Sequence, residues 1–470
     1  MEMITVGLNG DGNPFQIPRS VFSAGHTEFR GGSGSGKTMT LMQMVVALMA
    51  NSRDTMVILD LGASVMLRNG LKMGAEGTGR EFKEFSLTHM RMGFDPFQSF
   101  RKCDNPAIIA SWATSAFQMD HGGGYGPGYF TSVNSQVIRE AASEILAKGA
   151  LVDMQSLVNQ ISRSSKTRDT EVFNVLQPLK HFPQLSSESD LEQIVIADAL
   201  ANGDVIYMSL DCLVAPQSAR VVAGLACATV IMECISRSNQ NEMDNHAFVT
   251  IDEFSQLASP AWATWLTAAR KHNCNFTLAY QSTAQLSNAG KGLDEIVREN
   301  CRTHFYFTCV GSKDTDQLRD TSREVRTKLG GTSGVGLSAS LNSREVVDRQ
   351  LSVNEILDVS GTDREFFAIV NDGKGHREPV RVRSLEISKE ELERISTAPK
   401  WMAEVKTTQQ NVRVPSGEKI PVPQEVVNRM NQFFELQITD EEYTEDDSNG
   451  ASSYRSNVPS VNGQKSLFAN

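Results

Sequence analysis

A glycine-rich stretch near the N-terminus has the spacing of a phosphate-binding loop. Gly31 is followed after four residues by Gly36-Lys37-Thr38, which completes the G-x-x-x-x-G-K-[ST] pattern. Glycines let backbone N–H groups converge on the β- and γ-phosphates, while lysine adds a charge and threonine a hydroxyl for Mg²⁺. A flexible linker would not continue directly into "TMTLMQMVVALMA", which predicts a helix with its N-terminus at the anion. We therefore expect ATP and Mg²⁺ to be bound by Gly31, Gly32, Ser33, Gly34, Ser35, Gly36, Lys37 and Thr38.

Two acids at the end of a predicted strand supply the groups that hydrolysis needs. The segment "HAFVTIDEF", residues 246–254, is an apolar strand candidate that ends in Asp252-Glu253. In this arrangement the first acid reaches the Mg²⁺ ion together with Thr38, and the second polarises the attacking water. The alternative is a strand that ends in two acids by chance, and the phosphate-binding loop makes that alternative weaker. We therefore predict Asp252 as a metal ligand and Glu253 as the catalytic base.

Two further polar residues follow these acids at positions suited to catalysis. Gln281 ends the next strand candidate, "NFTLAYQS", where a glutamine can sense the γ-phosphate or orient water. Arg270 ends the helix between the two strands, in "WLTAARKHNC". If subunits form a ring, this arginine can reach the ATP of a neighbour. The alternatives remain a plain polar residue at a strand end for Gln281, and for Arg270 a cation favoured by the helix dipole.

Composition limits the class of protein. The 470 residues suffice for two or three domains, and 40% hydrophobic content is typical of a soluble globular protein. No run of 18 apolar residues and no signal-peptide pattern occurs, so we expect a cytoplasmic protein, for which a membrane-bound partner stays open. The 7 cysteines and 8 histidines are scattered without metal-binding spacing. A net charge of −11 excludes a uniformly basic surface but still allows a local patch that binds nucleic acid.

Strand and helix candidates alternate along most of the chain. Apolar strand candidates lie at 55–61, 204–211, 246–254, 275–282, 303–310 and 365–372. Such an alternation predicts an α/β fold with a mainly parallel central sheet. We expect residues 1–104 and 201–395 to form the nucleotide-binding domain and the helical stretches of 105–200 an inserted all-α domain. Residues 330–343 are predicted as a small-residue loop, and 396–470 as a largely disordered acidic extension with one short helix at 423–436.

Together, these motifs resemble those of a known family. The segments "FRGGSGSGKT", "VILDLGAS", "GFDPF", "FVTIDEFSQLAS", "AARKHNCNFTLAYQSTAQL" and "VRENCRTHFYF" match in order the landmarks of the type IV secretion coupling proteins, the TraG/TraD-type ATPases of conjugation. The resemblance covers about residues 1–385. It implies a RecA-like P-loop motor related to the HerA and FtsK ATPases, with an inserted all-α domain.

The resemblance also implies partners and residue roles. Coupling proteins are usually hexameric rings that engage DNA with its relaxase and inner-membrane secretion-channel components. By this resemblance, Lys37 matches the phosphate-binding position of the family, and Thr38 and Asp252 match the metal-binding positions. Glu253 matches the catalytic position, Arg270 the inter-subunit arginine and Gln281 the sensor.

Two departures from the family pattern are visible. Most members begin with two transmembrane helices that have no counterpart in this sequence, so we expect a soluble variant or a chain that docks at the inner membrane on a separate subunit. The family's D-P-K-G segment is here Asp60-Leu61-Gly62-Ala63. The acidic tail fits a docking segment for an adaptor protein, although many proteins end in disordered acidic runs.

The leading hypothesis is therefore an ATP-driven motor that couples a relaxase–DNA substrate to a type IV secretion channel. Alternatives that share the same site residues are a secretion-channel or pilus assembly ATPase and a HerA/FtsK-like pumping or packaging motor. A protein that binds ATP only to recruit partners is a different class, and the intact Asp252-Glu253 pair argues against it.

Overall fold

The computed structural model describes residues 2–119, 127–163, 167, 170–240, 242, 245–308, 311–333, 340–359, 364–373 and 378–399. The chain divides into two units, Met1–Glu404 and Val405–Asn470. All residues described below belong to the first unit. The predicted helix at 423–436 lies outside the described residues, as does the predicted disordered extension 396–470 from residue 400 onward.

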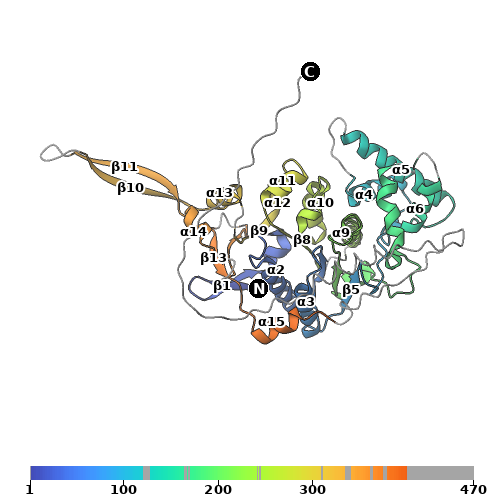
Figure 1. Cartoon of the computed structure of the whole chain (residues 1–470), viewed down its shortest axis with the longest axis horizontal. Coiled ribbons are helices and arrows are strands. Elements are labelled where there is room, and N and C mark those ends of the chain that lie inside the picture. The colour runs from blue at the N-terminus through green and yellow to red at the C-terminus, as the bar shows by residue number, and fades with distance from the viewer. Residues whose placement is uncertain are drawn as a thin grey trace, which may run out of the picture. The chain divides into compact units, whose positions relative to one another are not determined.

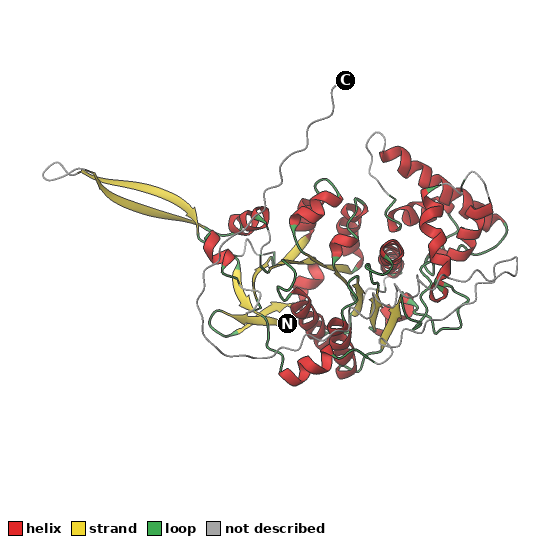
Figure 2. Cartoon of the chain, in the orientation of Figure 1, coloured by secondary structure: helices red, strands yellow, loops and turns green. Residues whose placement is uncertain are grey.

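The described part of the chain is built on an 11-stranded sheet (Figures 1 and 2). One side of this sheet is parallel, with neighbouring strands in the order β9-β3-β8-β7-β4-β6-β5. The predicted α/β fold with a mainly parallel sheet is thus confirmed. The bounds of these strands are β9 (Cys301–Tyr306), β3 (His26–Arg30), β8 (Cys274–Tyr280), β7 (Ala247–Asp252), β4 (Thr55–Asp60), β6 (Val205–Ser209) and β5 (Phe82–Ser86).

An antiparallel extension continues the sheet beyond β9. Strand β12 (Glu365–Val370) pairs with β9, and β13 (Val380–Arg383) pairs with β12. The N-terminal hairpin of β1 (Met3–Asn9) and β2 (Pro14–Pro18) then adds to β13. This extension joins the two ends of the described chain to the same sheet.

Both faces of the parallel strands are buried, which explains their near-continuous apolar sequences. In β4, Val57 and Leu59 belong to the apolar core on one face, while Met56 and Ile58 belong to the core on the other. The first face is covered by α9 (Pro216–Asn239) and α10 (Ala261–Ala269), and the second by α2 (Lys37–Asn51), α3 (Val65–Gly77) and α15 (Lys389–Ser396) (Figure 1). The alternation follows from the two-residue repeat of a strand.

The regular elements described between β5 and β6 are all helical. They are η1 (Phe100–Lys102), α4 (Pro106–Ala116), α5 (Pro127–Ala147), α6 (Met154–Arg163), α7 (Glu171–Leu176), η2 (Gln177–His181), η3 (Pro183–Leu185) and α8 (Ile196–Asn202). Their apolar side chains share one core with α9 and with one face of the sheet. The boundaries predicted for an inserted domain at 105 and 200 stay a prediction.

One helix in the described residues is long and apolar enough to cross a membrane. It is α9, with 24 residues and a mean hydropathy of 1.6 in its most apolar window. In the structure, 83% of that window is buried inside the protein. Gly224 of this helix faces α4, where an added Cβ would lie 2.0 Å from the carbonyl oxygen of Ala116. The apolar composition of α9 therefore corresponds to its place in the core.

A separate two-stranded ladder corrects one prediction. Strands β10 (Glu324–Ser333) and β11 (Ser340–Arg349) pair with each other over ten positions and are drawn apart from the main sheet (Figures 1 and 2). The prediction of a loop for 330–343 is therefore wrong for 330–333 and 340–343. Glycine and serine are poor strand formers, so the local sequence did not predict strands here. The pairing of β10 with β11 stabilises them. The hairpin is flanked by α13 (Ser312–Asp320) and α14 (Val353–Leu357).

Candidate active site

The phosphate-binding loop lies where β3 ends and α2 begins, at the carboxyl edge of the sheet. The N–H of Gly31 donates to the carbonyl of Tyr280 at 3.3 Å, and the N–H of Gly32 donates to the carbonyl of Thr308 at 3.0 Å. These bonds fix the start of the loop to the ends of β8 and β9. Gly31 has a φ of 155°, and a Cβ there would lie 2.6 Å from that of Phe307. Glycine is therefore required at this position by close approach.

Lys37 and Thr38 form the first turn of α2, after Gly36 in the left-handed region with a φ of 94°. The lysine is buried, and its Nζ donates to the carbonyls of Gly31 and Gly32 at 2.6 and 2.8 Å. Burial lowers the pKa of Lys37, and the charges of Glu253 and Asp252 oppose this shift. The loop thus holds its cation at the start of α2, where a helix N-terminus favours a bound phosphate.

Thr38 and Asp252 provide two adjacent oxygen atoms suited to Mg²⁺. The Thr38 hydroxyl donates to Asp252 Oδ2 at 3.0 Å, although the two residues are 214 positions apart in sequence. Two neighbouring oxygen ligands of an octahedral Mg²⁺ ion are also about 3.0 Å apart, because each lies about 2.1 Å from the metal at a right angle. Mg²⁺ is typically held by one or two carboxylates together with phosphate oxygens. The donor set of this site therefore fits the ion.

Glu253 follows β7 in an unusual backbone conformation. Its φ of 58° lies in the left-handed region, which is costly for a residue other than glycine. This turn places Glu253 near Gln281, and hydrogen bonding by the Gln281 side chain opposes the burial that raises the pKa of Glu253. Gln281 comes directly after β8, the strand between β3 and β7. The sheet order therefore brings together the loop, Glu253 and Gln281, as expected of groups at the carboxyl ends of parallel strands.

A third carboxylate joins this site, and the sequence analysis did not assign it. Asp60 ends β4, pairs in register with Asp252, and is completely buried. It accepts hydrogen bonds from the Tyr207 hydroxyl at 2.6 Å and from backbone N–H groups of Gly62 and Ser64. The available signal was an acid at the end of a buried apolar strand, the same pattern that identified Asp252.

The three carboxylates disfavour each other's charge. Burial, together with the charge of Asp252, raises the pKa of Asp60 from 3.8 to about 7. Burial also raises the pKa of Asp252, and burial and the Asp252 charge raise that of Glu253. A divalent cation at Thr38 and Asp252 would relieve this repulsion. The raised pKa of Glu253 also suits a group that must accept a proton near neutral pH.

Arg270 lies far from the other predicted site residues. It is exposed at the end of α10, before the amino end of β8, whereas Gln281 follows the carboxyl end of the same strand. Strand β8 has seven residues, which corresponds to a length of about 23 Å at ~3.3 Å per residue. The charge of Arg270 adds to the lowering of the pKa of His26, which lies at the amino end of β3. Arg270 and the phosphate-binding loop of one chain are thus at opposite edges of the sheet.

Arg364 is a second residue that the sequence analysis missed. A Cβ on Gly36 would lie 3.7 Å from Cβ and Cγ of Arg364, so this arginine lies against the phosphate-binding loop. Arg364 has a φ of 52°. Its carbonyl accepts two hydrogen bonds from Ser384, whose hydroxyl is 2.5 Å from that of Thr40 in the first part of α2. A separation of more than 320 residues left no local signal for this contact.

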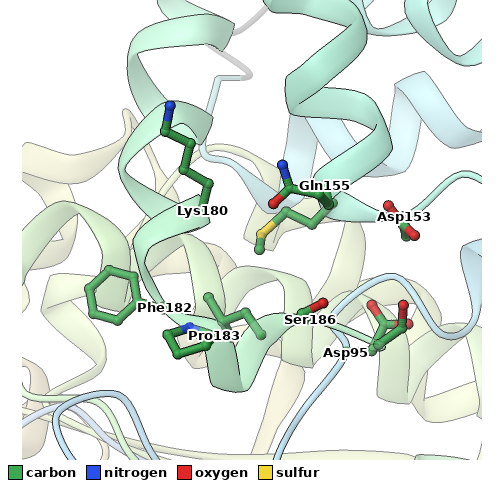
Figure 3. A pocket seen from close by; sticks show the side chains of 10 residues that line it. Asp95, Asp153, Gln155, Lys180, Phe182, Pro183 and Ser186 are labelled. Atoms are coloured by element: carbon green, nitrogen blue, oxygen red, sulfur yellow. The ribbon is translucent and has the colours of Figure 1, made fainter. Parts of the chain in front are cut away.

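The helical segment contains a small cavity that is unrelated to this site (Figure 3). Its volume is about 30 Å³, which is room for about one water molecule. None of the residues that line it belongs to the site at the sheet edge. They are Asp95, Asp153, Met154, Gln155, Lys180, Phe182, Pro183, Leu185, Ser186 and Ser187.

Comparison with known proteins gives a family segment and a fold. Residues 246–343 match a family model described as the TraM recognition site of TraD and TraG. A search of curated proteins finds no match. The matched segment runs from β7 through Gln281 to β11, so it contains the predicted acids, Arg270 and the predicted sensor glutamine.

Solved structures of the coupling protein TrwB and of VirB4 share the fold. The unbound bacterial conjugative coupling protein TrwBΔN70 is similar with a TM-score of 0.59 and 19% identity, covering 83% of this chain and 89% of that one. TrwB in complex with ADP and Mg²⁺ is similar with a TM-score of 0.56 and 17% identity, covering 81% and 89%. VirB4 of Thermoanaerobacter pseudethanolicus is similar with a TM-score of 0.52 and 12% identity, covering 83% and 97%. The resemblance to the type IV secretion coupling proteins is thereby confirmed, in a RecA-like P-loop fold and in one family segment.

Proposed function

We propose that this chain is an ATP-hydrolysing motor that drives a DNA substrate, bound with its relaxase, into a type IV secretion channel. The observation that carries the proposal is the meeting of Lys37, Thr38 and Asp252 at one sheet edge, with Glu253 and Gln281 beside them. The same fold occurs in TrwB, whose solved complexes contain an ATP analogue in one case and ADP with Mg²⁺ in another. These complexes support ATP and Mg²⁺ as the ligands of this site.

Each side chain of the site has a defined task in this proposal. Lys37 leaves the carbonyls of its own loop and donates to the β- and γ-phosphates. The Thr38 hydroxyl and the Asp252 carboxylate hold Mg²⁺, which when bound neutralises charge that develops on the phosphates. Glu253 accepts the proton of the attacking water, and Gln281 orients that water through its contact with Glu253.

Arg270 completes the site only if a second copy supplies it. An arginine that stabilises the transition state must reach the γ-phosphate. Within one chain it is separated from the loop by the length of β8. We therefore propose a head-to-tail ring, in which the amino edge of one sheet faces the carboxyl edge of the next. Six subunits are the number implied by the resemblance.

A relaxosome or adaptor protein is a further proposed partner. The family model that matches residues 246–343 is named for recognition of TraM. Strands β7 and β8 of this segment are buried on both faces, so they cannot be a docking surface. We propose that α13 and the β10–β11 hairpin, which follow them within or next to the matched segment, provide the contact. Inner-membrane channel components and an adaptor docked on the acidic tail remain part of this proposal.

An assembly ATPase is the second candidate function. The structural similarity to VirB4 of Thermoanaerobacter pseudethanolicus is the observation that favours it. The site residues are the same in both cases, so site geometry does not separate them. The substrate that stimulates hydrolysis distinguishes the two candidate functions.

ATP hydrolysis by the purified chain, with and without single- and double-stranded DNA over a salt series, tests the proposal. A DNA motor that contacts the phosphate backbone should hydrolyse faster with DNA, and salt should suppress the stimulation. Hydrolysis that is indifferent to DNA at every salt concentration would favour the assembly ATPase. Absence of hydrolysis under all conditions would contradict both, and would favour a protein that only binds nucleotide.

A further inference from the structure

A buried arginine directly precedes the phosphate-binding loop. Arg30 is the last residue of β3, is 2% exposed, and its carbonyl accepts the N–H of Phe307. Its guanidinium has five hydrogen-bond partners within 3.2 Å. They are the Tyr280 hydroxyl, the Thr283 hydroxyl, Asp314 Oδ1, Gln317 Oε1 and Glu28 Oε1.

The charge of Arg30 is balanced by a buried acid on the same strand. Glu28 is also fully buried, and it accepts hydrogen bonds from the Tyr280 hydroxyl and Arg30 and lies 2.9 Å from His304 Nδ1. Burial raises the pKa of Glu28, but the charge of Arg30 together with the contacts of His304 and Tyr280 outweighs this effect and holds the pKa well below its usual range. Burial lowers the pKa of Arg30, but Glu28 together with Tyr280, Tyr306 and Asp314 keeps it well above its usual value. Both groups therefore stay charged in the interior.

The partners of Arg30 lie on both sides of Gln281. Tyr280 precedes Gln281, and its ring centroid is 5.5 Å from the guanidinium carbon, in addition to the hydrogen bond of its hydroxyl. Thr283 follows Gln281 by two residues and begins α11 (Thr283–Ala289). Gln281 follows β8 and Glu253 follows β7, the adjacent parallel strand, so both lie at the same edge of the sheet. The guanidinium therefore fixes the chain before and after the residue that faces the proposed catalytic base.

The same cluster connects this segment to α13. Asp314 accepts hydrogen bonds from both the backbone N–H and the hydroxyl of Thr283, as well as from Arg30. Gln317, one turn later in α13, accepts the shortest of the Arg30 hydrogen bonds at 2.6 Å. A rigid guanidinium with donors in several directions can hold such an arrangement, whereas a lysine ammonium at the same place cannot reach all of these acceptors.

We propose that Arg30 is a positioning residue for ATP hydrolysis, which holds the Tyr280–Thr283 segment so that Gln281 meets Glu253 beside the phosphate-binding loop. This inference rests on the proposed function. None of the five hydrogen bonds of the Arg30 guanidinium goes to a group that would bind phosphate or metal, so we propose that the guanidinium acts through Gln281. A buried charge pair is a costly arrangement for stability alone, because apolar side chains of similar volume would serve as well.

A double-mutant cycle on the full chain tests the inference. Arg30→Lys keeps the charge but loses the planar fork, and we expect it to lower kcat about tenfold, since small displacements of a positioned group are costly for catalysis. Because the phosphate-binding loop is unchanged, the Kd for ATP should stay within about twofold of wild type. In a Gln281→Ala background, Arg30→Lys should change kcat by less than about twofold, because residues that act as one unit are not additive.

Two further variants complete the test. Arg68→Lys disrupts another buried pair, in which the Arg68 guanidinium binds Glu84 at 2.7 and 2.8 Å, and it should leave kcat unchanged. Thr283→Val removes one Arg30 acceptor with little change of shape, and its effect on kcat should also vanish in the Gln281→Ala background. The Thr283→Val variant tests the positioning role if Arg30→Lys does not fold.

The outcomes separate this inference from the proposed function. Additive losses for Arg30→Lys and Gln281→Ala would overturn the positioning role, and so would an unchanged kcat in Arg30→Lys. If Arg30→Lys does not fold, additive losses of kcat for Thr283→Val and Gln281→Ala would likewise overturn the positioning role. A wild-type chain that does not hydrolyse ATP would overturn the proposed function, and this inference with it.

Discussion

The position of Arg270 leads to a test of the proposed ring. Within one chain, the seven residues of β8 separate Arg270 from Gln281 by about 23 Å at ~3.3 Å per residue. An arginine side chain is much shorter than this distance. If Arg270 takes part in catalysis, it must therefore act on the nucleotide of a neighbouring subunit. We expect Arg270→Ala to reduce kcat by about 10³-fold or more, in line with other arginine fingers.

Mixing two inactive variants measures this arrangement directly. Lys37→Ala chains lack a working phosphate-binding loop but keep Arg270, while Arg270→Ala chains have the reverse defect. In rings formed from equal amounts of both, a site works when its loop comes from one variant and its arginine from the other. For head-to-tail contacts this applies to about one quarter of the sites, because each of the two choices is correct half the time. Mixed rings should therefore recover up to about a quarter of wild-type turnover.

The control is a mixture of Lys37→Ala with Glu253→Gln, which we expect to stay inactive. Lys37 and Glu253 both act on the nucleotide that their own chain binds. Every site in such a ring therefore lacks one of the two residues, whichever chain is its neighbour. Turnover that does not recover at any ratio of Lys37→Ala to Arg270→Ala would refute the inter-subunit role. Arg270 would then be a surface cation at a helix end, favoured by the helix dipole.

Three further predictions concern the base, the pH dependence of stability and the loop. Glu253→Gln should lower kcat by about 10²-fold or more, as expected for a lost general base, while ATP titration shows unchanged binding. His26 accepts a hydrogen bond from the N–H of Phe276 and contacts the Leu266 carbonyl, and burial lowers its pKa from 6.5 to about 4. Since the unfolded chain takes up this proton first, stability should fall by about 3 kcal/mol between pH 6.5 and 4, measured by urea unfolding. Gly31→Ala should destabilise the protein by about 1–3 kcal/mol in the same assay and abolish nucleotide binding, because its Cβ would overlap with Phe307.

Each of these has a matched control. Normal turnover in Glu253→Gln would contradict the assignment of the base. His26→Gln cannot titrate, so a pH dependence that is unchanged in this variant would show that other groups cause it. Gly34→Ala adds a methyl group where no atom lies within 4 Å. If it destabilises the fold as much as Gly31→Ala, close packing against Phe307 is not the reason.

Local sequence was sufficient to predict much of the sheet and the loop. Apolar runs predicted the parallel strands β4, β6, β7, β8 and β9, because a parallel strand buried on both faces needs apolar residues at nearly every position. The antiparallel strand β12 is also largely buried, and its apolar run predicted it too. The spacing of Gly31, Lys37 and Thr38 predicted a loop between a strand and a helix, and the structure has one there. Strand β5 and the β10–β11 hairpin were missed. The hairpin contains glycine and serine, which favour strands only when a partner is paired with them.

The sequence by itself determined which residues could bind phosphate and metal, because these roles depend on residue types over a few consecutive positions. Only the tertiary structure decided which of them meet. Strand β8 lies between β3 and β7, so Gln281 comes beside Glu253, while Arg270 of the same chain is left at the other edge. The partners of Arg30 come from positions up to 287 residues away, and Asp60 joins Asp252 through a strand pairing. These contacts depend on the order and register of strands, which no short stretch of sequence encodes.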